Sequence, residues 1–280
     1  MNTTRAHTAV ALLLVTIASL LIVPDSDAQR RRMGGFPRSY DPRTAPKREI
    51  FPDNRFTFCR IRYTGYGWGA PWDTDYPESD RHLSWRLSEL TTLNVQRDKN
   101  GEFYHVVMDL TDEGLFDYPF IYMLEVGNLM FSEPEVKALR SYLLRGGFLM
   151  VDDFWGEQEW ANWAMQIERV FDRDEYPMVE LPLKHPIFNL VFKLDEKPQV
   201  PNPGTWSYGG ETSEMGAHSA TPHYKGIHDK KGRLMVVICH NTDLGDGWER
   251  EGWNKAYFTE ISAKKAYPMG INIVVYAMTH

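Results

Sequence analysis

Three segments of the sequence gather carboxylates, aromatic rings and one histidine directly after hydrophobic runs that are typical of β-strands. These segments follow residues 56–63, residues 148–151 and residues 234–239. Ligands of parallel α/β sheets bind beyond the carboxyl ends of the strands, so we expect the three segments to share one rim. The candidate ligand-binding residues on them are Trp68, Asp73, Asp75, Tyr76, Arg81, Asp152, Asp153, Trp155, His240, Asp243, Asp246 and Trp248.

This set of side chains is suited to more than one kind of chemistry. Several carboxylates and a histidine are typical of a site for a hard metal ion. Carboxylates beside exposed tryptophan rings equally suit a sugar, and two carboxylates held close together permit acid–base hydrolysis. The spacing of a calcium-binding loop does not occur in these segments, so the sequence leaves both the presence and the identity of a metal open.

Each candidate also has a purely structural interpretation. Asp152 and Asp153 precede a predicted helix and could cap it. Asp243 could close a turn, and a lone histidine such as His240 at the end of a strand is usually a structural residue. Only the convergence of three polar loops on one rim favours a binding site.

The elements that would position these loops alternate between strand-like and helix-like patterns. This alternation predicts one three-layer α/β domain over residues 54–280, with a mostly parallel central sheet. The predicted strands are 56–63, 103–110, 120–126, 148–151 and 234–239, and the predicted helices are 83–94, 132–144, 157–171 and 266–278. Residues 176–224 are interpreted as a long excursion with short strands, and residues 228–233 as a hairpin turn.

The N-terminal segment predicts export. Arg5 precedes an apolar run over residues 9–23, and the small-residue pattern ending at Ala28 is typical of a signal-peptide cleavage site. We expect a periplasmic or extracellular protein; the alternative is an uncleaved inner-membrane anchor, although the run is shorter than the roughly 20 residues of a membrane span. Residues 29–53 are rich in arginine, glycine and proline, and we expect a disordered basic arm that can contact anionic lipid.

Charge and cysteine content argue against two classes of function, nucleic-acid binding and a cysteine-rich zinc site. The formal net charge of −7 argues against nucleic acid as a partner. The two cysteines, Cys59 and Cys239, both fall in predicted core strands, which favours buried thiols, with a disulfide as the alternative. Two cysteines without paired spacing do not form a cysteine-rich zinc site. The cofactor and the oligomeric state stay open.

Several motifs together resemble a known family, the bacterial domain of unknown function 4159, over residues 54–280. The motifs that carry this resemblance are Phe58-x-Arg60 with Tyr63, residues 73–77, residues 146–156, residues 240–246, and the ending Gly270-Ile271-Asn272-x-x-Val275-Tyr276-Ala277. The resemblance implies a flavodoxin-like fold related to the class I glutamine amidotransferases. It implies no particular reaction, because the family is itself uncharacterised.

The sequence departs from amidotransferases at the position that would carry their chemistry. Those enzymes place a cysteine nucleophile on a tight strand-to-helix turn, but residues 152–156 here read Asp-Asp-Phe-Trp-Gly. The sequence therefore argues against amide-nitrogen transfer from glutamine. Two hypotheses follow: a non-catalytic domain that binds an envelope glycan, peptide or partner protein, or a carboxylate- or metal-dependent hydrolase of envelope carbohydrate.

Overall fold

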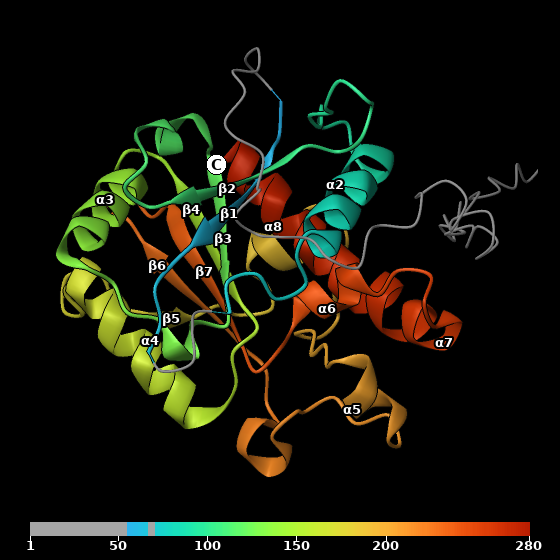
Figure 1. Cartoon of the computed structure of the whole chain (residues 1–280). Coiled ribbons are helices and arrows are strands. Elements are labelled where there is room, and N and C mark those ends of the chain that lie inside the picture. Colours follow the sequence, from blue (N-terminus) through green and yellow to red (C-terminus); the bar gives the residue numbers. More distant parts are fainter. Residues whose placement is uncertain (1–54, 67–70) are drawn as a thin grey trace, which may run out of the picture. The chain divides into compact units, whose positions relative to one another are not determined.

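Seven strands form one sheet in the order β2-β1-β3-β4-β7-β6-β5 in the computed structural model, which describes residues 55–66 and 71–280 (Figure 1). The strands are β1 (Phe58–Arg62), β2 (His105–Asp109), β3 (Phe120–Leu124), β4 (Phe148–Asp152), β5 (Val179–Glu180), β6 (His223–His228) and β7 (Leu234–His240). Strands β2, β1, β3, β4 and β7 run parallel, whereas β6 is antiparallel to both β7 and β5. The structure is therefore an α/β fold with a mostly parallel sheet.

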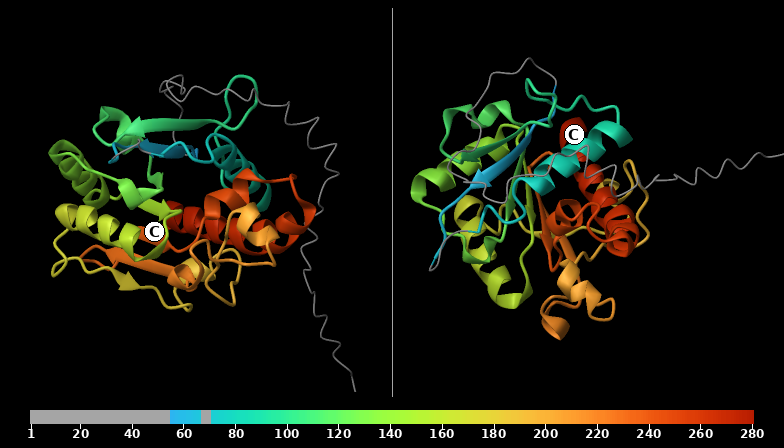
Figure 2. Two further views of the ribbon diagram at one scale, coloured as in Figure 1. Left: turned by 60° about the horizontal axis from the view of Figure 1, so that its bottom comes forward. Right: turned by 45° about the vertical axis from the view of Figure 1, so that its right-hand side comes forward.

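Helices cover both faces of this sheet (Figure 2). The α-helices are α2 (Glu78–Leu90), α3 (Glu133–Leu144), α4 (Gly156–Val170), α5 (Pro203–Ser207), α6 (Leu244–Glu249), α7 (Lys255–Tyr257) and α8 (Tyr267–Thr279). Short 3₁₀ turns span Glu113–Asp117, Val126–Asn128, Pro186–Phe188 and Gly216–Ser219, and a π-helical stretch, Phe258–Ala266, leads into α8. Helices α2, α6 and α8 contribute to the core on one face, and α3 and α4 contribute to the core on the other.

Alternation along the central strands explains the two cores. In β3, Phe120 and Tyr122 enter the core beneath α2 and α8, while Ile121 and Met123 enter the core beneath α3 and α4. All four side chains are fully buried. A strand covered on both faces needs apolar residues at every position, which is why these strands read as continuous hydrophobic runs.

The five predicted core strands are present, with ends within two residues of the expected positions. Helix α2 begins at Glu78, five residues before the predicted start at Leu83. Its first turn buries two polar side chains, Ser79 and Asp80, so an apolar repeat cannot reveal it. Both receive hydrogen bonds from Arg60, a residue of β1.

The predicted excursion and hairpin turn lie among the described residues, but the N-terminal predictions do not. The excursion between α4 and β6 contains β5, and the turn between β6 and β7 closes through a hydrogen bond from the Asp229 amide to the Arg233 carbonyl, with Gly232 at φ 87°. The predicted signal segment and basic arm lie outside the described residues. Among the helices that the structure describes, none has both the length and the apolar character to cross a membrane.

Candidate metal centre at the carboxyl edge of the sheet

Backbone hydrogen bonds join the loops that leave β3, β4 and β7. The Asp153 amide donates to the Thr242 carbonyl over 3.1 Å, and the Asn241 amide donates to the Phe154 carbonyl over 3.0 Å. The amide of Glu125 donates to the Asp153 carbonyl over 2.9 Å. The loops after these strands therefore form one connected rim, at the edge where the parallel strands end.

Acidic side chains from three separate loops meet on this rim. Asp75, Asp153 and Asp243 each offer one carboxylate oxygen, and the three oxygens lie within 4.8 Å of one another. We call these three residues the acidic triad. Two further groups meet the same distance limit and share members with the triad; they are Asp75, Asp246 and Glu249, and Glu214, Asp243 and Asp246.

The backbone of the rim is strained. Among the described residues other than glycine, those with positive φ are Asp75 (60°), Glu125 (53°), Asp153 (49°) and Asn241 (60°). Such conformations cost about 1–3 kcal/mol each and persist where surrounding structure imposes them, commonly at functional sites. Asp153 lies in the sharp turn between β4 and α4. Its positive φ lets the chain change direction from the strand into the helix.

Few internal partners neutralise the acidic triad. Asp153 Oδ1 accepts a hydrogen bond from Trp155 Nε1 over 3.1 Å, and Asp243 Oδ1 accepts one from the Asp246 amide over 2.8 Å. The Oδ2 atom of Asp75 is buried and has no hydrogen-bond partner. No lysine or arginine of the described residues forms an ion pair with a triad member.

Burial and mutual repulsion govern the protonation of the acidic triad. Burial is the main reason that the pKa values of Asp75, Asp153 and Asp243 lie well above the usual value for aspartate. Neighbouring carboxylates raise each pKa further: Asp246 acts on Asp75, Glu125 acts on Asp153, and Asp153 acts on Asp243. Buried carboxylates this close must share protons or hold a cation.

Asp152 lies behind the triad and is completely buried. Its Oδ2 accepts hydrogen bonds from the Tyr122 hydroxyl and the Gly245 amide, each over 3.1 Å, while its Oδ1 is buried without a partner. Burial raises its pKa to about 7. A Cβ atom on Gly245 would lie 2.7 Å from Asp75 Oδ2, so glycine is what allows the loop after β7 to approach the triad.

The group formed by Asp75, Asp246 and Glu249 differs from the triad because two of its carboxylates already pair with the guanidinium of Arg250. Nε of Arg250 lies 3.2 Å from Asp246 Oδ1 and 2.6 Å from Glu249 Oε2. No such ion pair reaches a triad member among the described residues, although Arg60 and Arg250 partly offset the raised pKa of Asp75 from a greater distance, so the triad has the stronger demand for a bound cation.

Arg60 holds the loop that carries Asp75. Its guanidinium is fully buried, pairs with Asp80 at 2.5 Å, and donates to the carbonyls of Trp72 and Thr74 over 2.9 and 2.8 Å. These bonds fix the backbone up to the residue before Asp75. The bond to the Trp72 carbonyl also satisfies a buried acceptor, as buried polar groups require.

Several predicted site residues are not members of the triad. His240 Nε2 donates a hydrogen bond to the Gly156 carbonyl over 3.0 Å, and its ring packs on Phe154 and Trp160. Tyr76 contacts His105 Nε2 through its hydroxyl at 2.9 Å. Asp73 is exposed and Arg81 lies on α2, while Trp68 lies outside the described residues.

The expectation that tryptophan rings stand exposed on the rim is wrong for Trp155 and Trp248. Trp248 is completely buried against Tyr122 at a centroid distance of 6.0 Å, and Trp155 is 5% exposed and bonded to Asp153. A sequence cannot distinguish a tryptophan that faces a ligand from one that packs beneath the ligand's site.

Three acidic residues near the rim, Glu125, Glu214 and Glu249, are not among the site residues predicted from the sequence. Glu125 directly follows β3, and this position at the end of a strand could have identified it. Burial and its neighbour Glu159 raise the pKa of Glu125 to about 7. Glu214 lies in the irregular excursion, where no pattern signals a site, whereas Glu249 ends the polar segment after β7 that also carries Asp243 and Asp246.

Comparison with known proteins identifies a family for this chain but names no activity. The profile of the Domain of unknown function (DUF4159) matches residues 57–278. No curated protein matches the sequence. The match covers the sheet, the helices on both faces and all three loops of the acidic triad, so the chain belongs to the DUF4159 family.

Proposed function

We propose that this chain is an exported binding domain that depends on a divalent cation held by Asp75, Asp153 and Asp243. The observation that carries the proposal is the convergence of three carboxylate oxygens within 4.8 Å, with no ion pair to a described lysine or arginine and with the buried Asp75 Oδ2 unbonded. A cation would satisfy that oxygen and remove the repulsion between the three carboxylates.

The ligand atoms favour a hard cation such as Mg²⁺, Mn²⁺ or Ca²⁺. All three triad ligands are carboxylate oxygens, and hard cations prefer oxygen. Oxygen ligands on opposite sides of a calcium ion lie up to about 5 Å apart, so the spacing of the triad is compatible with its ligand shell. Neither thiol lies in a loop of the triad, since Cys59 and Cys239 are buried in β1 and β7.

The scaffold proposed for this function is the flavodoxin-like, amidotransferase-like fold. Its support is the strand order, in which β2, β1, β3, β4 and β7 follow the doubly wound arrangement of flavodoxin-like sheets. The turn at Asp153 takes the place of the strand-to-helix turn that carries the amidotransferase nucleophile. Asp153 would there serve as a cation ligand. Export rests on the signal-peptide pattern ending at Ala28.

Hydrolysis is the second candidate function. It is favoured by the number of carboxylates beyond the triad, because Asp246, Glu249 and Glu214 join overlapping groups within the same distance limit. One cation does not need so many acidic ligands. A carboxylate outside the coordination shell could instead act as a general base toward a cation-bound water.

Titration calorimetry with Mg²⁺, Mn²⁺ and Ca²⁺ tests the proposal. The purified protein should bind at least one of these ions saturably, and Asp153→Asn should weaken binding at least tenfold because a neutral amide is a poorer ligand. Asp195→Asn is the matched control, since that carboxylate is 85% exposed and lies in a surface ion pair with Lys193. Equal affinity of the Asp153→Asn variant and the control would refute the site.

A screen of envelope glycans with the identified cation separates the two functions. Saturable, cation-dependent binding without turnover would establish a binding domain. Turnover that is lost in chelator and in Asp153→Asn would establish a hydrolase.

A further inference from the structure

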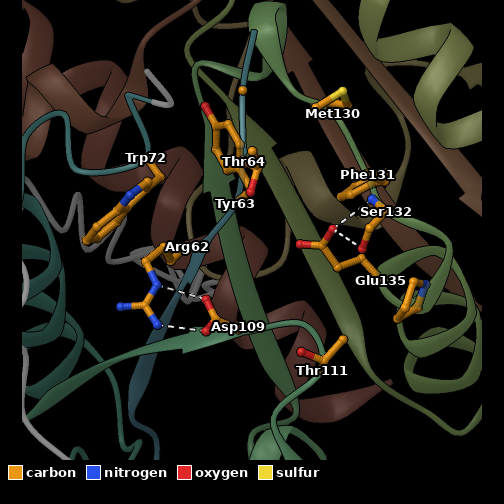
Figure 3. Close-up of a pocket in the computed structure, with 12 residues that line it drawn as sticks. Arg62, Tyr63, Thr64, Trp72, Asp109, Thr111, Met130, Phe131, Ser132 and Glu135 are labelled. Atoms are coloured by element: carbon orange, nitrogen blue, oxygen red, sulfur yellow. Dashed lines mark hydrogen bonds and ion pairs between the residues drawn. The ribbon is translucent and has the colours of Figure 1, made fainter. Parts of the chain in front are cut away.

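Strand β2 ends at a cavity of about 810 Å³, where Asp109 pairs with Arg62 (Figure 3), and it begins beside a tight hairpin. The hairpin spans residues 97–103, since an antiparallel bridge joins Arg97 to Phe103. The Phe103 ring packs against the core beneath α2 and α8, and Cζ of Arg97 lies 3.7 Å from its centre. The hairpin is therefore a packed part of the domain, at the opposite end of β2 from the cavity.

The tip of the hairpin carries the one Asn-Gly pair of the sequence, Asn100-Gly101. Both residues are exposed, and Gly101 has a φ of 85°. Apart from the chain neighbours of Gly101, no atom of the described residues lies within 4 Å of the position that a Cβ would occupy there. Because glycine has no side chain to block the approach, its backbone nitrogen can reach the side-chain carbonyl carbon of the preceding asparagine. An exposed Asn-Gly pair is therefore able to rearrange without an enzyme.

This rearrangement, deamidation, needs only water. The Gly101 nitrogen bonds to Cγ of Asn100, and the Cγ–Nδ2 bond breaks. The proton of the attacking nitrogen leaves with the side-chain amide group as ammonia, and a cyclic succinimide remains. Water then adds to one of the two ring carbonyl carbons and breaks its bond to nitrogen. Cleavage at Cγ gives aspartate, whereas cleavage at the backbone carbonyl carbon gives isoaspartate, in which the backbone runs through Cγ.

Hydrogen bonds to Asp98 hold the turn at residues 98–101 in a shape that opposes the reaction. The Gly101 amide, which contains the attacking nitrogen, donates to the Asp98 carbonyl over 3.0 Å. Nδ2 of Asn100 donates to Asp98 Oδ2 over 3.2 Å. Oδ1 of Asp98 accepts hydrogen bonds from the amides of Asn100 and Glu102 over 2.8 and 2.9 Å. The two reacting groups are thus both bonded to Asp98, so the turn must open before they can meet.

The charge of the Asp98 carboxylate acts in the same direction. The Gly101 nitrogen attacks after it has lost its proton, and a carboxylate nearby disfavours that negatively charged form. Removal of the Asp98 side chain should therefore accelerate deamidation for two reasons, the freedom of the turn and the loss of the charge.

We propose that Asn100 is a site of spontaneous deamidation and that Asp98 limits its rate by keeping the turn closed. The inference is independent of the cation site. Conversion replaces the Nδ2 donor with a carboxylate beside that of Asp98, and like charges repel. Isoaspartate also lengthens the backbone within the turn, so the product loses the pairing of Arg97 with Phe103.

Mass spectrometry of tryptic peptides follows the reaction while the purified protein is incubated at mildly alkaline pH, and an isoaspartyl methyltransferase assay detects isoaspartate. The peptide that contains Asn100 should gain the mass difference between a carboxyl and a carboxamide group, with isoaspartate among its products. Asn189 is the control within the same chain. It is exposed and its Nδ2 also donates a hydrogen bond, to the Leu183 carbonyl over 3.0 Å, but Leu190 follows it, so its peptide should remain unchanged.

Asp98→Ala should deamidate at Asn100 at least tenfold faster than the unchanged protein. Asp172→Ala is the matched control, because Asp172 Oδ1 likewise accepts the amide two residues on, that of Asp174, over 2.9 Å, but lies outside the hairpin. The unchanged protein unfolded in denaturant gives a second reference with an open turn, whether or not Asp98→Ala folds. Asn100 should react there at least tenfold faster than in the folded protein.

The outcomes separate the site from its control by Asp98. Conversion of Asn189 as fast as that of Asn100, or no conversion of Asn100 in the folded protein while the unfolded chain reacts completely, would overturn the site. Equal rates at Asn100 in Asp98→Ala, in Asp172→Ala and in the unchanged protein would overturn the role of Asp98.

Discussion

Two arginines on β1, Arg60 and Arg62, show how strongly the setting of an ion pair decides its value. Arg60 and Asp80 are both 0% exposed at their side chains, while the side chains of Arg62 and Asp109 are 44% and 39% exposed. A surface pair contributes about 0–1 kcal/mol, but breaking a buried pair costs about 3–5 kcal/mol because the remaining charge is left without a partner.

Arg60→Met should therefore lower the free energy of unfolding by about 3–5 kcal/mol, while Arg62→Met lowers it by less than about 1 kcal/mol. Denaturant unfolding of the two variants measures both values on the same strand. The double variant Arg60→Met with Asp80→Leu should recover only the part due to the unpaired Asp80 charge, because the carbonyls of Trp72 and Thr74 still lack the donor that Arg60 supplied. Equal destabilisation by the two single variants would contradict the role assigned to Arg60.

His105 predicts a specific dependence of stability on pH. Burial lowers its pKa from 6.5 to about 4, against the opposing influence of Asp80. Because the folded state disfavours the protonated form of His105, protonation of this side chain lowers the free energy of unfolding. With respect to His105, the protein therefore has its full stability above pH 6.5 and loses stability as the pH falls toward 4. The loss amounts to about 3 kcal/mol at most.

Unfolding measurements between pH 7 and pH 4 test this prediction. His105→Gln does not titrate, so its stability should fall less over this interval than that of the unchanged protein. His218→Gln, at an exposed histidine, serves as the control and should follow the unchanged protein. Parallel curves for all three proteins would show that His105 does not carry the effect.

At the scale of elements, the loop after β7 reaches the acidic triad because Gly245 has no side chain. A Cβ atom at this position would lie 2.7 Å from Asp75 Oδ2 and 3.2 Å from Asp243 Oδ1. Gly245→Ala should therefore displace two triad carboxylates and weaken cation binding at least tenfold, about 1.4 kcal/mol.

Gly204→Ala on α5 is a control for the substitution itself, since its Cβ would meet the Asn202 Oδ1 atom at 3.0 Å, a milder crowding outside the triad. Calorimetry with the cation that the unchanged protein binds measures the difference. An unchanged affinity in Gly245→Ala would mean that the triad does not hold the ion.

The same scale shows why some elements could be predicted and others could not. Strands that are buried on both faces can be predicted because they read as apolar runs. The start of the helix after Ser132 can be predicted because Ser132 and Glu135 form a capping box. The start of α2 could not be predicted because its buried polar residues are satisfied by Arg60, a distant residue in the sequence. Such long-range pairing leaves no local pattern.

Some residues of the candidate site could likewise be predicted from the sequence, and others could not. Asp75, Asp153 and Asp243 could be proposed from the sequence because each lies in a segment that follows a predicted strand. The direction of the Trp155 and Trp248 rings, and the approach of Glu214 from the excursion, depend on tertiary packing. Loops between elements carry no periodicity from which that packing could be derived.

At the scale of the whole molecule, the acidic triad joins parts of the chain that are far apart in sequence. Asp75 follows β1, Asp153 follows β4 and Asp243 follows β7, so one cation would link loops from three strands of the sheet. It would also neutralise part of an acidic chain whose formal net charge is −7. The loops of Asp153 and Asp243 already hold one another by backbone hydrogen bonds, and Arg60 holds the loop of Asp75, so the site is largely formed before a cation binds.

The most direct test of this account is a crystal structure of the protein with Mn²⁺, in which anomalous scattering locates the ion. We predict an anomalous peak about 2.1–2.4 Å from one oxygen each of Asp75, Asp153 and Asp243, and loss of that peak in crystals of Asp153→Asn. A well-ordered rim without any anomalous peak at the triad, or with Mn²⁺ bound only at other carboxylates, would contradict the account.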